Sequence, residues 1–188
     1  MPERSDHLRA FFAVNLETRI LAEIREIQNR FRHLEGIRWV HPERMHITLA
    51  FLGEIEEDRV DRLSRALAGP AGKLTAFSLS FRGAGVFPNL KNPRVLWLGV
   101  DEGKKELRQI HALIQEALPY KERERRFSPH VTLGRRKKNA GLHLDAGLLS
   151  DEISCPGKQW VDRFHLMKST LHPAGPVYES LQEYFLKP

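Results

Sequence analysis

Apolar residues recur at two different periods along the first part of the chain, and the two periods predict alternating strands and helices. The apolar run at residues 8–16 has the length of a strand, and residues 37–40 predict a second, shorter one. Between residues 18 and 34, apolar positions follow the spacing of an amphipathic helix, and residues 60–67 repeat that pattern. The order strand, helix, strand, helix indicates a mixed fold.

The middle of the chain carries a strand pattern, a loop pattern and a third helix pattern. Residues 77–82 alternate apolar and polar side chains, which is typical of a half-buried strand. Glycine, proline and asparagine are frequent in residues 83–93 and predict a loop-rich connection. A buried strand is expected at residues 94–100, and residues 107–118 present the apolar face of a helix.

The last part of the chain predicts an irregular segment followed by two strands. Residues 137–156 lack a clear period, whereas residues 160–168 and 177–186 predict strands on either side of a Pro-Gly turn. The two halves of the chain have loosely similar order without a residue-by-residue repeat. We therefore expect two lobes that face one another across a groove, and not two independent domains.

A four-residue motif occurs twice and carries the strongest chemical signal. His46-Ile47-Thr48-Leu49 and His130-Val131-Thr132-Leu133 are both His, β-branched, Thr, Leu. Side chains on a strand alternate between faces, so each motif buries two aliphatic residues and presents a His-x-Thr pair opposite them. Two histidines on facing strands can supply one general base and one general acid.

One such motif alone is usually a partly exposed sheet face, but two matched copies favour a catalytic site. Because histidine titrates near pH ~6.5, both of its protonation states are accessible at neutral pH. A histidine pair can therefore deprotonate a water that attacks a phosphodiester and protonate the alkoxide that leaves. The hydroxyls of Thr48 and Thr132, beside the histidines, are suited to hydrogen-bond the nonbridging phosphate oxygens.

The length and composition set wide limits. The chain has 188 residues, enough for one domain or for two small lobes that share a core. Cys155 is the only cysteine, so an intrachain disulfide and a four-cysteine zinc site are excluded. No apolar run approaches the ~20 residues of a membrane span, and the start of the chain lacks the apolar stretch of a signal peptide. We expect a soluble, cytoplasmic protein.

The positive charge of the chain is concentrated around the second motif. The formal net charge is +6, and residues 121–138 account for all of it with eight basic and two acidic residues. The basic residues are Lys121, Arg123, Arg125, Arg126, Arg135, Arg136, Lys137 and Lys138. A local positive field favours a phosphate-bearing ligand, preferably a polyanion, although charged loops can also serve only to solvate a surface.

These motifs and their surroundings resemble the 2H phosphoesterases, named for two H-x-[ST] motifs. More specifically, the chain resembles the LigT-like RNA 2′,3′-cyclic phosphodiesterases, also called 2′-5′ RNA ligases, over nearly its whole length. Beyond the motifs, the resemblance rests on Arg9-Ala10-Phe11-Phe12-Ala13-Val14, Trp39-Val40, Gly85-Val86-Phe87-Pro88, Pro93-Arg94-Val95-Leu96-Trp97, Phe127-Ser128-Pro129, Lys168-Ser169-Thr170-Leu171 and Tyr178.

The resemblance implies an α+β fold of two pseudo-symmetric lobes, each an antiparallel sheet backed by helices, with the active groove between them. The lobes form one domain over residues 1–188, which is expected to hydrolyse RNA 2′,3′-cyclic phosphate ends to 2′-phosphates without a metal or cofactor. By similarity, His46 is the acid that protonates the leaving O3′ and His130 the base that activates water, with the opposite assignment left open by the symmetry of the motifs. The expected partner is an RNA 3′ end that bears the cyclic phosphate. No membrane partner is expected, and the protein is expected to be a monomer. Reaction with a 5′-hydroxyl RNA instead of water would give 2′-5′ ligation without ATP.

Arg135 follows His130 by five residues, where the family tends to carry an arginine that contacts phosphate. Strict alternation would place Arg135 on the face opposite His130. Gly134 offers a way to place Arg135 on the face of His130, because a glycine in a strand often marks a bulge, which interrupts the alternation. The alternative is that Arg135 is one more surface cation.

Several other residues are weaker candidates. Phe12 and Trp97 could border the groove or stack on a base, but a core position is the simpler expectation for both. Tyr178 is a candidate to approach the site from the last strands, and His111 is expected to be structural. Four further histidines show no spacing that suggests a metal site: His41, His143, His165 and His172.

Two other functions fit the same motifs. A binding module would hold RNA ends or 2′-5′-linked oligonucleotides without turnover, although arginine and lysine alone would serve that purpose. A phosphodiesterase for a different substrate, such as 2′-5′ oligoadenylate or an ADP-ribose cyclic phosphate, would use the same two histidines.

Overall fold

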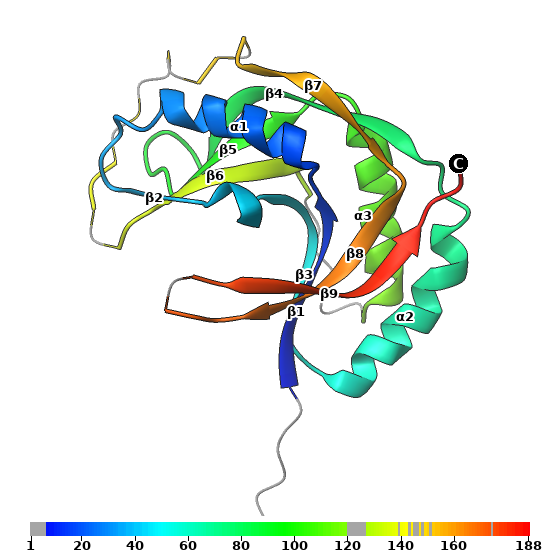
Figure 1. Cartoon of the computed structure of the whole chain (residues 1–188). Coiled ribbons are helices and arrows are strands. Elements are labelled where there is room, and N and C mark those ends of the chain that lie inside the picture. Colours follow the sequence, from blue (N-terminus) through cyan, green and yellow to red (C-terminus); the bar gives the residue numbers. More distant parts are fainter. Residues whose placement is uncertain are drawn as a thin grey trace, which may run out of the picture.

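The computed structural model describes residues 7–119, 127–138, 140–142, 144, 147, 149–150, 152–173 and 175–188, and it confirms the α+β class (Figure 1). Its strands are β1 (His7–Asn15), β2 (Ile37–Trp39), β3 (His46–Glu56), β4 (Phe77–Phe87), β5 (Val95–Val100), β6 (His130–Arg136), β7 (Ser154–Val161), β8 (Arg163–Thr170) and β9 (Val177–Phe185). All pairings between these strands are antiparallel, in the order β7-β4-β5-β6-β3-β1-β8-β9, with β2 beside β6.

Three α-helices and a short 3₁₀ turn accompany the sheet: α1 (Thr18–Arg30), α2 (Glu57–Ala71), α3 (Lys104–Ala117) and η1 (Pro42–Arg44). The α-helices occur where the apolar spacing predicted them, and each buries the predicted apolar stripe, as α1 does with Ile20, Ile24 and Ile27. None of the described helices is both long and apolar enough to span a membrane.

The sheet has two halves that meet at its centre. One half contains β1, β3, β8 and β9, and the other contains β2, β4, β5, β6 and β7. The halves are joined between β3 and β6 by one pair of residues in register, Ile47 and Val131. The units β1–α1–β3 and β5–α3–β6 share the order strand, helix, strand, apart from β2 and η1, which lie between α1 and β3. The last strand of each unit begins with a histidine motif. The pseudo-symmetry expected from the sequence is therefore visible in the topology.

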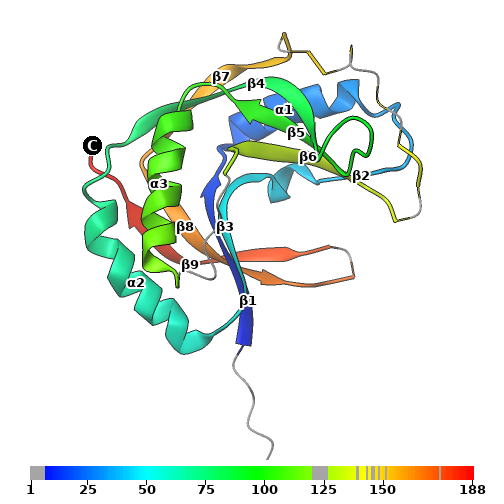
Figure 2. The ribbon, with the colours of Figure 1, turned by 180° about the vertical axis from the view of Figure 1, so that it is seen from behind.

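Helices α1 and α3 each cross to the other half of the sheet (Figures 1 and 2). Helix α1 follows β1 in the chain but packs on β7 in the other half, while α3 follows β5 and packs on β3. The side-chain amide of Gln28, fully buried on α1, donates hydrogen bonds of 2.8 Å to the carbonyls of Val40 and Leu133. Each histidine strand is thus supported by a helix that belongs to the other repeat unit.

The burial of the two motif strands follows the predicted alternation. Ile47, Leu49, Val131 and Leu133 are at most 1% exposed and belong to the main core. The histidines and threonines between them are half-buried on the other face. The aliphatic face of each motif is therefore anchored in the core, and the polar face is left for chemistry.

The prediction of a loop at residues 83–93 is wrong for its first half, because β4 continues to Phe87. Gly83 has a positive φ of 76° and lies at a shift in the register between β4 and β5. At Gly85, an added Cβ atom would clash with the ring of Trp97, so the indole packs directly over the glycine backbone. Gly83 allows the strand to be irregular, and Gly85 allows the indole of Trp97 to approach the backbone closely. The glycine content alone cannot distinguish such a strand from a loop.

The prediction that the irregular segment extends over residues 137–156 is wrong at its C-terminal end. Strand β7 already begins at Ser154, and residues 160 and 161 belong to it and not to β8. Its side chains alternate strictly between exposed and buried. Pro156 obscured this pattern, but β7 is an edge strand, where a missing N–H is tolerated. Part of residues 137–156, including His143, lies outside the described residues.

Candidate active site

The two motifs lie side by side where the halves of the sheet meet. Ile47 of β3 and Val131 of β6 are paired in antiparallel register. In such a pair the flanking residues project to the opposite face. His46 and Thr48 therefore share one face with His130 and Thr132, related by a local two-fold through the Ile47–Val131 pair. The structure brings all four predicted motif residues together.

Each histidine is oriented by a backbone carbonyl two residues before it. The Nδ1 atom of His46 lies 2.9 Å from the carbonyl oxygen of Arg44, and that of His130 lies 2.7 Å from the carbonyl oxygen of Ser128. A carbonyl only accepts, so both Nδ1 atoms carry the proton and donate it. Nε2 of each ring is then the atom available for proton transfer.

The sequence analysis did not identify these orienting carbonyls. The hint available was the segment before each motif: Arg44 ends the 3₁₀ turn η1, and Ser128 precedes Pro129. In both segments a turn-prone stretch leads into the strand. This path of the chain directs the backbone carbonyl of the residue two positions before the histidine toward the histidine ring.

Burial keeps both histidines neutral in the ligand-free protein. It lowers the pKa of His46 to about 4. The charge of Arg135, and the charge that His130 carries when protonated, act in the same direction, against the hydrogen bond to Arg44. Burial and Arg135 likewise lower the pKa of His130, against the hydrogen bond to Ser128. Arg135 thus lies close enough to influence both rings.

A β-bulge in β6 returns Arg135 to the side of the histidines. Leu96 of β5 pairs with Gly134, but its neighbour Trp97 pairs with Thr132, so Leu133 is the extra residue. Leu133 and Gly134 are both buried, and Arg135 is exposed. The bulge expected at Gly134 is therefore present, and it resolves the conflict between strict alternation and a role for Arg135 at the site.

Strand β3 has the same irregularity at the same place. The partner of Phe12 is Ala50 and that of Ala13 is Thr48, so Leu49 is the extra residue. Phe51 consequently occupies the position in β3 that Arg135 occupies in β6, and it is 56% exposed. The two halves share their backbone geometry but present a cation on one side and an aromatic ring on the other.

Aromatic rings surround the two histidines. The ring of His46 lies 4.9 Å from that of Phe11 and 5.3 Å from the edge-on ring of Tyr178. His130 lies 5.0 Å from Phe87 and 6.3 Å from Trp97, measured between ring centroids. These rings explain the burial that lowers the pKa of both histidines.

The weaker candidates divide between site and core. Tyr178 approaches the site as expected, whereas Phe12 is fully buried in the core. His111 is structural, because its Nδ1 donates to the carbonyl of Leu49 at 2.8 Å and its ring stacks on Phe127. The sequence analysis missed Phe11 and Phe87, although both lie in segments that carry the family resemblance.

The basic cluster is only partly within the described residues. Lys121, Arg123, Arg125 and Arg126 lie outside them. The other four basic residues, Arg135, Arg136, Lys137 and Lys138, continue from the end of β6. The described residues contain no group of three or more His, Cys, Asp or Glu side chains arranged to hold a metal ion.

Comparisons with known proteins identify relatives over nearly the whole chain. The model of the LigT-like phosphoesterase family matches residues 14–97. A protein of Archaeoglobus fulgidus, named RNA 2′,3′-cyclic phosphodiesterase, is 34% identical over 94% of this chain and 99% of its own length. A Thermus thermophilus protein of the same name is 36% identical over 96% of this chain and 91% of its own length.

Solved structures agree with this assignment. The crystal structure of TT0787 from Thermus thermophilus has a TM-score of 0.78 and 30% identity, with 96% of this chain and 98% of that chain covered. The structure of E. coli LigT complexed with 3′-AMP has a TM-score of 0.74 and 25% identity, with 98% of this chain and 100% of that chain covered. The chain therefore belongs to the LigT-like phosphoesterase family.

Proposed function

We propose that the protein hydrolyses RNA 2′,3′-cyclic phosphate ends to 2′-phosphates with His46 and His130 as the acid and the base. The observation that carries the proposal is the pair of histidines across the β3–β6 junction, each with Nδ1 held by a carbonyl and both within the influence of Arg135. The names of the relatives support this substrate class, since those from Archaeoglobus fulgidus and Thermus thermophilus are called RNA 2′,3′-cyclic phosphodiesterases.

The proposed reaction needs two proton transfers. Nε2 of His130 takes a proton from water, the water oxygen forms a bond to phosphorus, and the bond from phosphorus to O3′ breaks. Nε2 of His46 gives its proton to O3′, which leaves as a hydroxyl and yields a 2′-phosphate. Thr48, Thr132 and Arg135 stabilise the negative charge on the nonbridging oxygens by hydrogen bonds and charge.

The acid must acquire its proton when the substrate binds. With a pKa of about 4, His46 is neutral in the ligand-free protein at neutral pH. The negative charge of a bound cyclic phosphate favours the protonated ring and therefore raises this pKa. The substrate thus helps to prepare the acid that cleaves it.

The same geometry accommodates ligation. If the 5′-hydroxyl of a second RNA replaces water as the nucleophile, the same steps join it to phosphorus and release O3′, which gives a 2′-5′ linkage. The bond to O3′ is exchanged for the new bond, so ATP is not required. Because residues of one chain perform both proton transfers, the proposed enzyme acts as a monomer without a metal or cofactor.

The decisive experiment is product analysis on an RNA that ends in a 2′,3′-cyclic phosphate, in the presence of EDTA. We expect a 2′-phosphate from the wild type, and a loss of kcat of about 10²–10⁴-fold for His46→Ala and for His130→Ala. His41→Ala, which changes an exposed histidine paired with Glu43, serves as the control and should remain active. Full activity of either site variant would refute the two-histidine mechanism, and binding without turnover by the wild type would indicate a binding module.

A further inference from the structure

A basic pocket opens at the end of β6, beyond the motif residues. It has a volume of about 500 Å³ and is lined by Arg94, Arg136, Lys137, Lys138 and Ala140. Backbone hydrogen bonds fix its walls: the N–H of Arg136 donates to the carbonyl of Arg94 at 2.9 Å, and the N–H of Lys137 donates to that of Gly36 at 2.8 Å. The strand end thus gathers four cationic side chains from two segments that are distant in sequence.

None of the carboxylates that the structure describes neutralises the cations of this pocket. Within the described part of the chain, no Asp or Glu oxygen forms an ion pair with Arg94, Arg136, Lys137 or Lys138. The guanidinium of Arg136 is held instead by the neutral side chain of Asn92, at 2.8 Å. This arrangement leaves the positive charge available to an anion.

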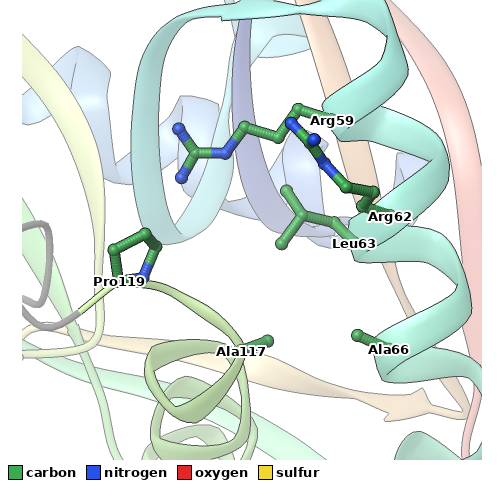
Figure 3. Close-up of a pocket in the computed structure, with 6 residues that line it drawn as sticks. All are labelled: Arg59, Arg62, Leu63, Ala66, Ala117 and Pro119. Atoms are coloured by element: carbon green, nitrogen blue, oxygen red, sulfur yellow. The ribbon is translucent and has the colours of Figure 1, made fainter.

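A second pocket, of about 400 Å³, lies between α2 and α3 and provides a contrast (Figure 3). It also has two arginines, Arg59 and Arg62, but its other lining residues are Leu63, Ala66, Ala117 and Pro119. Arg62 forms an ion pair of 3.2 Å with Asp58. This pocket is therefore less suited to bind an anion than the pocket at β6.

The pocket at β6 cannot hold the same phosphate as the histidines. Arg136 follows His130 by six residues, and because Leu133 is the extra residue of the bulge, this corresponds to about 17 Å along the strand. Neighbouring side chains on a strand point to opposite faces, so Arg136 turns away from the face to which the bulge returns Arg135. A ligand that fills both places needs a second negative group at a distance from the first.

We propose that the pocket of Arg94, Arg136, Lys137 and Lys138 binds an internal phosphate of the RNA strand whose cyclic phosphate end occupies the histidine site. The inference rests on the proposed function and deepens it, because it makes an RNA strand a better substrate than a mononucleotide. An RNA that ends in a 2′,3′-cyclic phosphate carries further phosphodiesters on its 5′ side. These phosphodiesters provide the second negative group that a ligand needs to reach both the histidine site and the pocket.

The test compares two substrates and two double variants. The substrates are a nucleoside 2′,3′-cyclic phosphate and a short single-stranded RNA that ends in the same cyclic phosphate nucleoside. Lys137→Glu/Lys138→Glu reverses two exposed charges of the pocket. Lys104→Glu/Lys105→Glu makes the same change at the other end of β5, in the exposed first turn of α3, where Glu is favourable for the helix.

We expect the pocket variant to lower kcat/KM for the RNA by roughly tenfold or more, through KM, and to leave the mononucleotide unaffected. Its salt dependence for the RNA should decrease in log–log slope by about 0.7 for each phosphate that the variant no longer binds. The control variant should match the wild type on both substrates. A DNA strand of the same length should compete with the RNA in the wild type and less so in the pocket variant, because the site contacts phosphates.

Each outcome bears on one of the two proposals. Equal loss on both substrates, equal loss in the control variant, or unchanged RNA kinetics in the pocket variant would overturn the second phosphate site while the cyclic phosphodiesterase activity stands. If the wild type cleaves neither substrate, the proposed function fails. RNA binding that still depends on Lys137 and Lys138 would then support the pocket alone.

Discussion

At the scale of single residues, Arg135 is the group that couples the two halves of the site. Its charge lowers the pKa of both His46 and His130, although it belongs to the strand of His130 alone. On the other half, the matching position carries Phe51, which has no charge. The arginine charge that lowers the pKa of both rings thus comes from the half that contains β6.

Replacement of Arg135 by glutamine should shift the pH dependence of the enzyme. Because Arg135 lowers the pKa of His130, its removal raises that pKa, and more of the base is protonated at a given pH. The acidic limb of kcat/KM, which reports the free enzyme, should therefore move to higher pH. The KM should rise as well, since glutamine cannot replace the charged hydrogen bond of arginine to the phosphate.

Arg38→Gln provides the matched control for this experiment. Arg38 is an exposed arginine of β2 in register with Arg135, and it is not among the charges that lower the pKa of either histidine. Its variant should keep the wild-type profile. A profile of Arg135→Gln that does not move, or that moves to lower pH, would contradict the electrostatic coupling.

The motif side chains could be predicted from the sequence, but the atoms that orient them could not. Alternation along a strand is a fixed property of the backbone, so the faces of His46 and Thr48 follow from their spacing. The carbonyls of Arg44 and Ser128 are present in every peptide and gain their role only from the path of the chain before each strand. No side-chain pattern encodes that path.

At the scale of elements, the bulges in β3 and β6 determine what lies beside the histidines. In both strands the fourth residue of the motif is the extra one, and the side chain two positions later turns to the site. In β6 the bulge includes Gly134, whose backbone lies close to side chains of β2. A Cβ atom there would lie 2.5 Å from Cγ2 of Ile37 and 3.1 Å from the ring of Trp39, both on β2.

Gly134→Ala should therefore damage both stability and activity. The added methyl group must push β2 away from β6 or shift the bulge, which costs about 1–3 kcal/mol of the free energy of unfolding. A shifted bulge also moves Arg135, so kcat/KM should fall beyond the effect on the folded fraction. Chemical denaturation together with kinetics on the folded protein measures the two effects separately.

Gly69→Ala is the control. Gly69 lies near the end of α2, and a Cβ atom there would meet no atom within 4 Å outside its chain neighbours and its own helix. The gain in helix propensity from alanine is opposed by Pro70, which disfavours the helical conformation for the residue before it, so both stability and activity should stay close to those of the wild type. A Gly134→Ala variant as stable and active as the wild type would show that the bulge does not depend on the close contact with β2.

The sequence predicted the helices better than the irregular strands, for a physical reason. A helix such as α1 reveals itself through a continuous apolar stripe. Strand β4 continues through Gly83 and Gly85 because of contacts with β5 and Trp97, which are distant in sequence. The exchange of α1 and α3 between the halves likewise depends on tertiary packing, so the local pattern contains no sign of it.

At the scale of the whole molecule, the pseudo-two-fold gives the two histidines the same backbone setting, and the differences between the halves must assign their roles. His46 is surrounded by Phe11 and Tyr178, whereas the half of His130 carries Arg135 and the second basic pocket. Under the proposed function, the half that contains β6 thus offers Arg135 and the basic pocket to the negatively charged strand.

A substrate that needs no acid can distinguish the two roles. In a p-nitrophenyl phosphodiester the leaving group departs as a stable anion, so protonation of the leaving oxygen contributes little. If His46 is the acid, His46→Ala should lose about 10²–10⁴-fold on the cyclic phosphate but much less on the nitrophenyl ester. His130→Ala should lose activity on both, because water still requires a base. If His130→Ala were the variant spared on the nitrophenyl ester, the roles would be reversed, and water would attack from the half of the molecule that carries β3.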